Sequence, residues 1–178
     1  ICLLVVLIHF SAIQESWFPA PKEFGSLFLG IFDSAPFWWV FIVLSLFAGV
    51  CEEVLFRGFI QKGLRTRLGP WGGLIVASIM FGIFHLTPYK LVSTTVLGLW
   101  MGFIFQVTGS LWMSIFAHAF NNGLAALAVH FARIHGVEDA VEAGGRQLPI
   151  TALIIAALLL TILSKVFVQV NSSNTDSV

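Results

Sequence analysis

The stretch Cys51-Glu52-Glu53-Val54-Leu55-Phe56-Arg57-Gly58 decides how this chain folds. It ends an otherwise apolar run, Pro36–Val50, that would pass for a membrane span. An ionisable side chain at bilayer depth costs at least about 2.5–3.5 kcal/mol, and such residues usually face a bundle interior or a water-filled cavity. Two adjacent carboxylates and a guanidinium in this setting therefore indicate a functional site.

The composition of the whole chain is that of an integral membrane protein. Of 178 residues, 58% are hydrophobic and 10% are charged, and the mean hydropathy is +0.95. An average soluble domain has about 25% charged residues. The formal net charge of zero gives no support for nucleic acid as a partner. Cys2 and Cys51 fit no zinc or disulfide spacing and are expected to be small, buried apolar residues.

The hydrophobic runs predict an all-α, polytopic transmembrane bundle of about six helices, because about 20 helical residues cross the hydrocarbon. The predicted spans are Ile1 to Ile13, Pro36 to Gln61, Pro70 to Leu86, Lys90 to Val107, Leu111 to Ala132 and Pro149 to Val170. We expect one domain over residues 1–170, with its motifs at about 50–122, and a polar, disordered tail at 171–178. Because residue 1 is Ile, we expect that helices upstream of it are missing.

Basic residues give the orientation of the bundle. Lys62, Arg65 and Arg67 follow the second predicted span, and Lys and Arg concentrate on the cytoplasmic side of membrane proteins. This link is therefore predicted to be cytoplasmic. The membrane would be the plasma membrane in a prokaryote and the endoplasmic reticulum in a eukaryote.

Helix geometry divides the charges of the second span into two groups. Glu53 and Arg57 are four residues apart, so they share a face and are expected to pair, while Glu52 is rotated by about 100°. A turn directly before Pro70 would bring Glu52 and His85 to the same height in an antiparallel hairpin. Glu52 is thereby left free to face a substrate.

Two other spans carry polar residues that complete a shared cavity. His118 and Asn122 are four apart on the fifth span and can aim at one point, and Phe81 lies four before His85. A carboxylate and an imidazole can hold a water molecule and take its proton. A second imidazole and an amide can donate hydrogen bonds to the oxyanion that forms on a peptide carbonyl. The same residues also allow zinc held by His85, His118 and a Glu, so a metal site stays open.

Three motifs, in order, give this chain a family resemblance. They are Glu52-Glu53-x-x-Phe56-Arg57-Gly58, Phe81-x-x-x-His85 and His118-Ala119-x-x-Asn122, and they resemble the signature of the CPBP family of CAAX prenyl proteases and bacteriocin-processing or immunity membrane proteins. The resemblance implies a glutamic-type intramembrane protease without a metal cofactor. It also implies functional roles for the residues that stand at the matching motif positions.

The resemblance gives roles to six of the motif residues, and Phe81 is expected from its spacing to pack beside His85. Glu52 with His85 would activate water, and His118 with Asn122 would form the oxyanion hole. Glu53 and Arg57 would orient the site. The substrate would be a peptide or a lipid-modified protein reached within the bilayer.

Two alternatives from other classes of protein remain. A membrane immunity or scaffold factor could bind a partner through the same cavity without catalysis. A carrier that couples transport to a buried carboxylate is disfavoured, because no repeated half is visible in the sequence.

Overall fold

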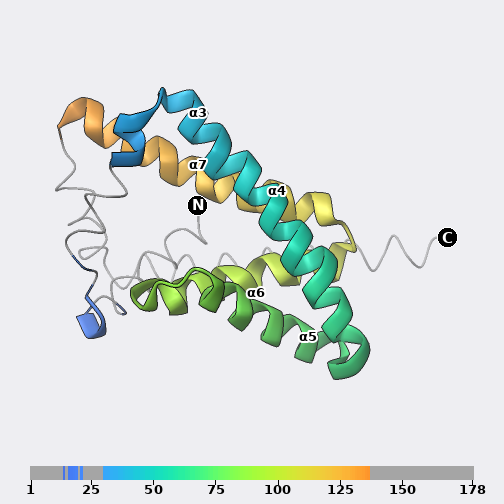
Figure 1. Cartoon of the computed structure of the whole chain (residues 1–178). Helices are drawn as coiled ribbons and strands as arrows, with labels where there is room; N and C mark the ends of the chain where they lie inside the picture. The colour runs from blue at the N-terminus through green and yellow to red at the C-terminus, as the bar shows by residue number, and fades with distance from the viewer. Residues whose placement is uncertain (1–13, 15, 20, 22–29, 137–178) are drawn as a thin grey trace, which may run out of the picture.

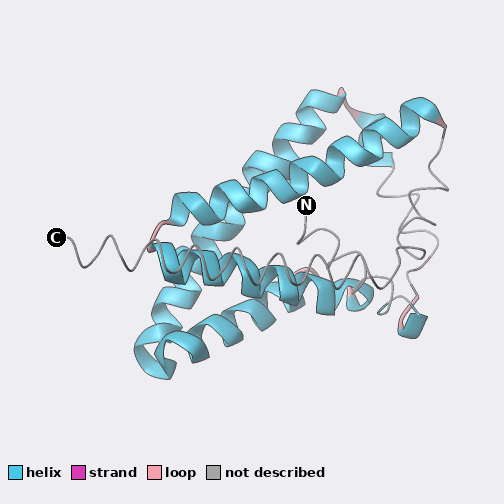
Figure 2. Cartoon of the chain, turned by 180° about the vertical axis from the view of Figure 1, so that it is seen from behind, coloured by secondary structure: helices cyan, strands magenta, loops and turns pink. Residues whose placement is uncertain are grey.

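The computed structural model describes residues 14, 16–19, 21 and 30–136. All regular structure in this part of the chain is helical (Figure 2). Three helical runs are long and apolar enough to cross a membrane: Phe37–Phe84, Pro88–Thr108 and Leu111–His135. The described part of the chain is therefore all-helical, and the chain is a multi-pass integral membrane protein.

The first run contains two of the predicted spans. Its elements are α3 (Phe37–Phe41), the π-helical η1 (Ile42–Phe47), α4 (Ala48–Glu53), the π-helical η2 (Val54–Gln61) and α5 (Lys62–Phe84). Gly69 interrupts α5 with φ 72° and ψ 175°, a conformation that is essentially restricted to glycine. The chain turns back there, directly before Pro70, as the sequence predicts (Figure 1).

The second half of the bundle contributes two further long helices. The short 3₁₀ turn η3 (Pro88–Lys90) leads into α6 (Leu91–Thr108), which is followed by α7 (Leu111–His135). In Figure 1, α7 lies alongside the helix from α3 to α4, and α5 pairs with α6. Because α4 packs on α7 while η2 packs on α5, the residues on either side of Glu53 meet different helices.

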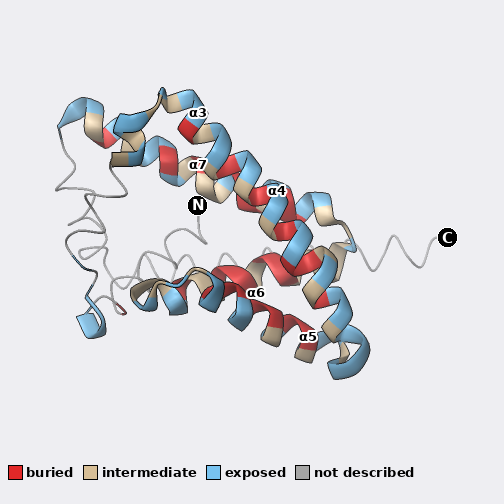
Figure 3. Cartoon of the chain, viewed as in Figure 1, coloured by how far each residue is buried: buried red, intermediate tan, exposed pale blue. Residues whose placement is uncertain are grey.

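The core and the outer surface are both apolar. The buried core cluster between these helices consists of Phe56, Phe81, Leu97 and Met101. Figure 3 shows the buried residues of the helices in red. The outer faces expose many large apolar side chains. This pattern suits a helix bundle surrounded by lipid, where apolar surface needs no cover. Cys51 belongs to this outer surface, so the expectation that it is buried is wrong.

The four central spans begin and end close to their predicted bounds. The main difference lies in the predicted link at 62–69, where the helix continues as the first turns of α5 and exposes Lys62, Arg65 and Arg67. The predicted spans at 1–13 and 149–170 and the polar tail lie outside the described residues, so six spans are not shown. The cytoplasmic location of the basic residues stays a prediction.

Candidate active site

Glu53 lies at the centre of the polar cluster. The residue is fully buried at 0% exposure, and both carboxylate oxygens accept hydrogen bonds. Oε1 accepts from Arg57 Nη1 at 2.8 Å and from His118 Nδ1 at 2.7 Å. Oε2 accepts from the Ser114 hydroxyl. The hydrogen-bonding capacity of this buried carboxylate is therefore largely satisfied.

Arg57 joins the same cluster to α6. The side chain uses its two terminal nitrogens on different partners, because Nη2 donates to the carbonyl oxygen of Gly98 at 2.8 Å. Its guanidinium carbon lies 4.7 Å from the centroid of the Phe81 ring, which adds a cation–π contact. The predicted pairing of Glu53 with Arg57 is confirmed.

One turn further along η2, Gln61 makes a parallel contact. Its amide nitrogen donates to the carbonyl oxygen of Gly102 at 3.0 Å. A Cβ at Gly98 would lie 3.2 Å from Phe81 Cδ1, and one at Gly102 would lie 2.8 Å from Gln61 Oε1. The two glycines, four residues apart, therefore let α6 approach closely enough for both side chains to reach its backbone.

Among the described residues, Glu52 has a buried carboxylate oxygen without a hydrogen-bond partner. Its side chain is 25% exposed, while its Oε2 atom is buried and makes no hydrogen bond. That atom lies 3.9 Å from His118 Nε2, which is too long for a direct hydrogen bond. Since Nδ1 of the same ring is bound to Glu53, His118 presents Nε2 to Glu52.

His85 stands at the edge of this cluster. It caps the end of α5, its Nδ1 lies 2.8 Å from the Phe81 carbonyl oxygen, and its ring packs against Phe81 with centroids 4.8 Å apart. Phe81 also contacts the His118 ring at 5.8 Å, so this fully buried phenylalanine links the two imidazoles. The predicted packing of Phe81 beside His85 is confirmed.

The expectation that Glu52 and His85 face each other across a water molecule stays a prediction. Within the described residues, no ion pair joins Glu52 to His85, and the nearest recorded basic group is His118. Glu52 lies on α4, which packs against α7, and His85 ends α5, which packs against η2 and α6. The roles of Glu52 and His85 in catalysis stay a prediction.

Asn122 lies one turn beyond His118 on α7. Its amide nitrogen donates to the carbonyl oxygen of Leu44 at 3.1 Å, and its oxygen accepts from Asn121 at 3.3 Å. An amide nitrogen carries two hydrogens, so the bond to Leu44 uses one of them. Asn122 is thus oriented by η1.

In residues 14, 16–19, 21 and 30–136, no group of three His, Cys, Asp or Glu side chains could hold a metal ion. Ser114, Gln61, Gly98 and Gly102 take part in the cluster although the sequence did not mark them as site residues. The signal for Ser114 was its position four residues before His118, on the same face of the helix.

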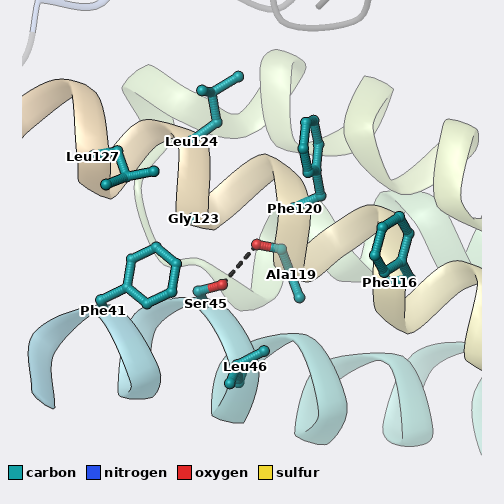
Figure 4. Close-up of a pocket in the computed structure, with 9 residues that line it drawn as sticks. All are labelled: Phe41, Ser45, Leu46, Phe116, Ala119, Phe120, Gly123, Leu124 and Leu127. Atoms are coloured by element: carbon teal, nitrogen blue, oxygen red, sulfur yellow. Dashed lines mark hydrogen bonds between the residues drawn. The ribbon is translucent and has the colours of Figure 1, made fainter. Parts of the chain in front are cut away.

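An apolar cavity of about 240 Å³ lies between α7 and the helix of α3 and η1. Figure 4 shows its lining: Phe41, Ser45, Leu46, Phe116, Ala119, Phe120, Gly123, Leu124 and Leu127. The polar side chain among these is Ser45, and its hydroxyl donates to the carbonyl oxygen of Ala119 at 2.7 Å. The cavity therefore offers an apolar surface, and one of its lining residues, Ala119, directly follows His118 in the sequence.

Fold and site together define a helical membrane protein with a buried Glu-Arg-His network beside an unpartnered carboxylate. The family model described as type II CAAX prenyl endopeptidase Rce1-like matches residues 34–124, just over half of the chain. The chain belongs to this Rce1-like family, in agreement with the resemblance of its three motifs.

Two proteins of Bacillus subtilis (strain 168) are similar to this chain. "Putative membrane peptidase YdiL" is 31% identical over 81 residues, which cover 46% of this chain and 33% of that protein. "Uncharacterized protein YpbD" is 27% identical over 139 residues, which cover 75% of this chain and 68% of that protein. The chain thus spans about a third of the first relative and two thirds of the second. No solved structure matches it.

Proposed function

We propose that this protein is an intramembrane endopeptidase that hydrolyses a peptide bond by direct attack of water. The observation that carries the proposal is the buried, unpartnered Oε2 of Glu52, which faces Nε2 of a histidine whose other nitrogen is bound to Glu53. A carboxylate that lacks a partner inside a charged cluster suits a base that holds a water molecule. Membership of an endopeptidase family supports the same reaction.

In the proposed reaction, Glu52 removes a proton from the water while the water oxygen bonds to the carbonyl carbon of the substrate. His85 helps to orient that water. The carbonyl electrons move to oxygen, and His118 and Asn122 donate hydrogen bonds to the oxyanion. When the carbonyl re-forms, the carbon–nitrogen bond breaks, and the proton on Glu52 passes to the leaving amine. No covalent bond to the protein forms.

The hydrogen bond from His118 to Glu53 sets a condition on this reaction. Because Nδ1 donates to Glu53, Nε2 carries a proton only when the ring is an imidazolium. In that form His118 and Arg57 together balance the charges of Glu52 and Glu53. The cluster is then neutral as a whole, which lowers the cost of burying it in a membrane.

The substrate is proposed to be a peptide or a lipid-modified protein that enters from the bilayer. The apolar cavity beside α7 suits a hydrocarbon chain or an apolar peptide segment, because it presents almost no polar surface. The basic residues Lys62, Arg65 and Arg67 are proposed to lie on the cytoplasmic side.

The proposal is tested with Glu52→Gln in purified protein reconstituted in lipid vesicles. The probe is an internally quenched peptide that ends in a farnesylated CAAX sequence, and terminal proteomics of cell membranes covers other substrates. Loss of a general base lowers kcat by about 10²–10⁴-fold. Asp33→Asn is the matched control, because this exposed carboxylate pairs with Arg133 outside the cluster. Equal cleavage by wild type and Glu52→Gln would overturn the proposal.

Two further observations would distinguish the alternatives from this proposal. Activity that chelators remove and zinc restores would indicate a zinc protease on the same residues. A non-enzymatic immunity or scaffold protein would keep its phenotype in Glu52→Ala and His85→Ala, while Arg57→Ala would lower the protein level.

A further inference from the structure

Ser114 is part of the buried cluster around Glu53 and belongs to none of the three motifs. The residue is fully buried on α7, one turn before His118. Its hydroxyl donates to Glu53 Oε2 and lies 3.2 Å from the carbonyl oxygen of Met101. A hydroxyl has one hydrogen, and a carboxylate is the stronger acceptor, so the bond to Glu53 takes it.

Arg57 does not hold the second oxygen of Glu53. A guanidinium can bind both oxygens of one carboxylate with its two terminal nitrogens. Here Nη1 binds Glu53 Oε1, and Nη2 binds the carbonyl oxygen of Gly98. The Arg57 side chain is therefore divided between two helices, and within the described residues the bond recorded at Glu53 Oε2 comes from Ser114.

This division gives Ser114 a particular task. The terminal torsion of a glutamate is broad and has no strong minimum of its own. Two donors on Oε1 restrain one oxygen of the carboxylate, and the donor on Oε2 holds the other, so the plane is restrained from both sides. A fixed plane directs Oε1 at His118 Nδ1 and thereby sets the direction of Nε2, which faces Glu52.

We propose that Ser114 is a positioning residue that acts on the reaction through Glu53 and His118. The inference rests on the proposed peptidase function. Ser114 touches neither water nor substrate in this scheme. Loss of its hydroxyl is expected to misdirect His118 without removing any catalytic group, and small misplacements in active sites lower rates by about 10–100-fold.

The kinetic test uses the peptide cleavage assay described above. Ser114→Ala is expected to lower kcat by about 10–100-fold and to leave KM unchanged, because substrate binding does not involve this residue. Ser78→Ala is the matched control. Ser78 is equally buried, but its hydroxyl donates to Leu74 O at 2.7 Å within its own helix. Equal loss of kcat in both variants would overturn the proposal.

A pair of isosteric variants separates the hydroxyl from packing. Ser114→Thr keeps the donor, whereas Ser114→Val replaces it with a methyl group of the same shape. Any loss caused by the larger side chain is common to both. We expect the Thr variant to exceed the Val variant at least tenfold in kcat, and equal rates would contradict the proposal even if Ser114→Ala fails to fold.

A spectroscopic readout distinguishes failure of this inference from failure of the peptidase assignment. Nitrogen-15 spectra of the labelled His118 side chain report the hydrogen bond at Nδ1 without any substrate. Ser114→Ala is expected to shift this signal, and Ser78→Ala is not. A shift in a protein that cleaves nothing would refute the function alone. An unchanged signal, beside activity that depends on Glu52, would refute the role of Ser114 alone.

Discussion

Replacement of Arg57 by methionine removes the one guanidinium in the buried cluster and keeps a side chain of similar length. Arg57 is 1% exposed, and its loss deletes the ion pair to Glu53, the hydrogen bond to Gly98 O and the contact with Phe81. The largest effect is on Glu53, which keeps its buried charge without a cation on its own helix. Breaking a buried pair in this way destabilises proteins by about 3–5 kcal/mol.

The measurement is the free energy of unfolding in mixed micelles, compared between variants. Arg57→Met is expected to lose about 3–5 kcal/mol. Combining it with Glu53→Gln should recover part of that loss, because no uncompensated charge is then left. The control is Arg67→Met, an exposed residue whose replacement should change stability by less than about 0.5 kcal/mol.

The reasoning would be refuted by either of two results. A loss below about 1 kcal/mol in Arg57→Met would mean that the pair contributes no more than an ordinary hydrogen bond. Losses that simply add in the double variant would mean that Glu53 and Arg57 do not act as a pair.

Two further predictions concern glycines. Gly102→Ala should destabilise the bundle by about 1–3 kcal/mol, because the added Cβ would lie 2.5 Å from Leu74 Cδ1 and 2.8 Å from Gln61 Oε1. Thermal unfolding in detergent measures this effect, and an unchanged unfolding midpoint would contradict the prediction. Gly69→Ala should destabilise by about 1–3 kcal/mol through the strain of φ 72° alone, since a Cβ there meets nothing within 4 Å. The same measurement applies, and a rise in the midpoint would argue against a strained turn.

The membrane-spanning helices and one ion pair could be predicted from the sequence. Long apolar runs set the helix bounds to within a few residues, apart from the first turns of α5, because lipid requires backbone groups to bond within their own segment. Glu53 and Arg57 share a face by their spacing alone. The turn at Gly69 was marked by glycine followed by proline, both poor residues for continuing a helix.

Contacts between distant helices could not be predicted in the same way. Whether Glu53 or Glu52 reaches His118 depends on how α4 is rotated against α7, and spacing along one helix carries no information about its neighbour. The π-helical geometry of η1 and η2 changes that rotation and has no sequence signal that we recognise. Ser114 was missed because a serine in a transmembrane helix commonly binds its own backbone.

The pairing of Glu53 with Arg57 inside a single helix has a consequence for biogenesis. A nascent membrane segment enters the bilayer before its later neighbours have been synthesised. His118 and Ser114 follow more than 50 residues later in the chain, so they cannot help Glu53 at that moment. The counter-ion four residues away can, because it travels in the same segment. The translocon thus meets a segment in which Glu53 already has its counter-ion, so the pairing of this carboxylate does not wait for the bundle to assemble.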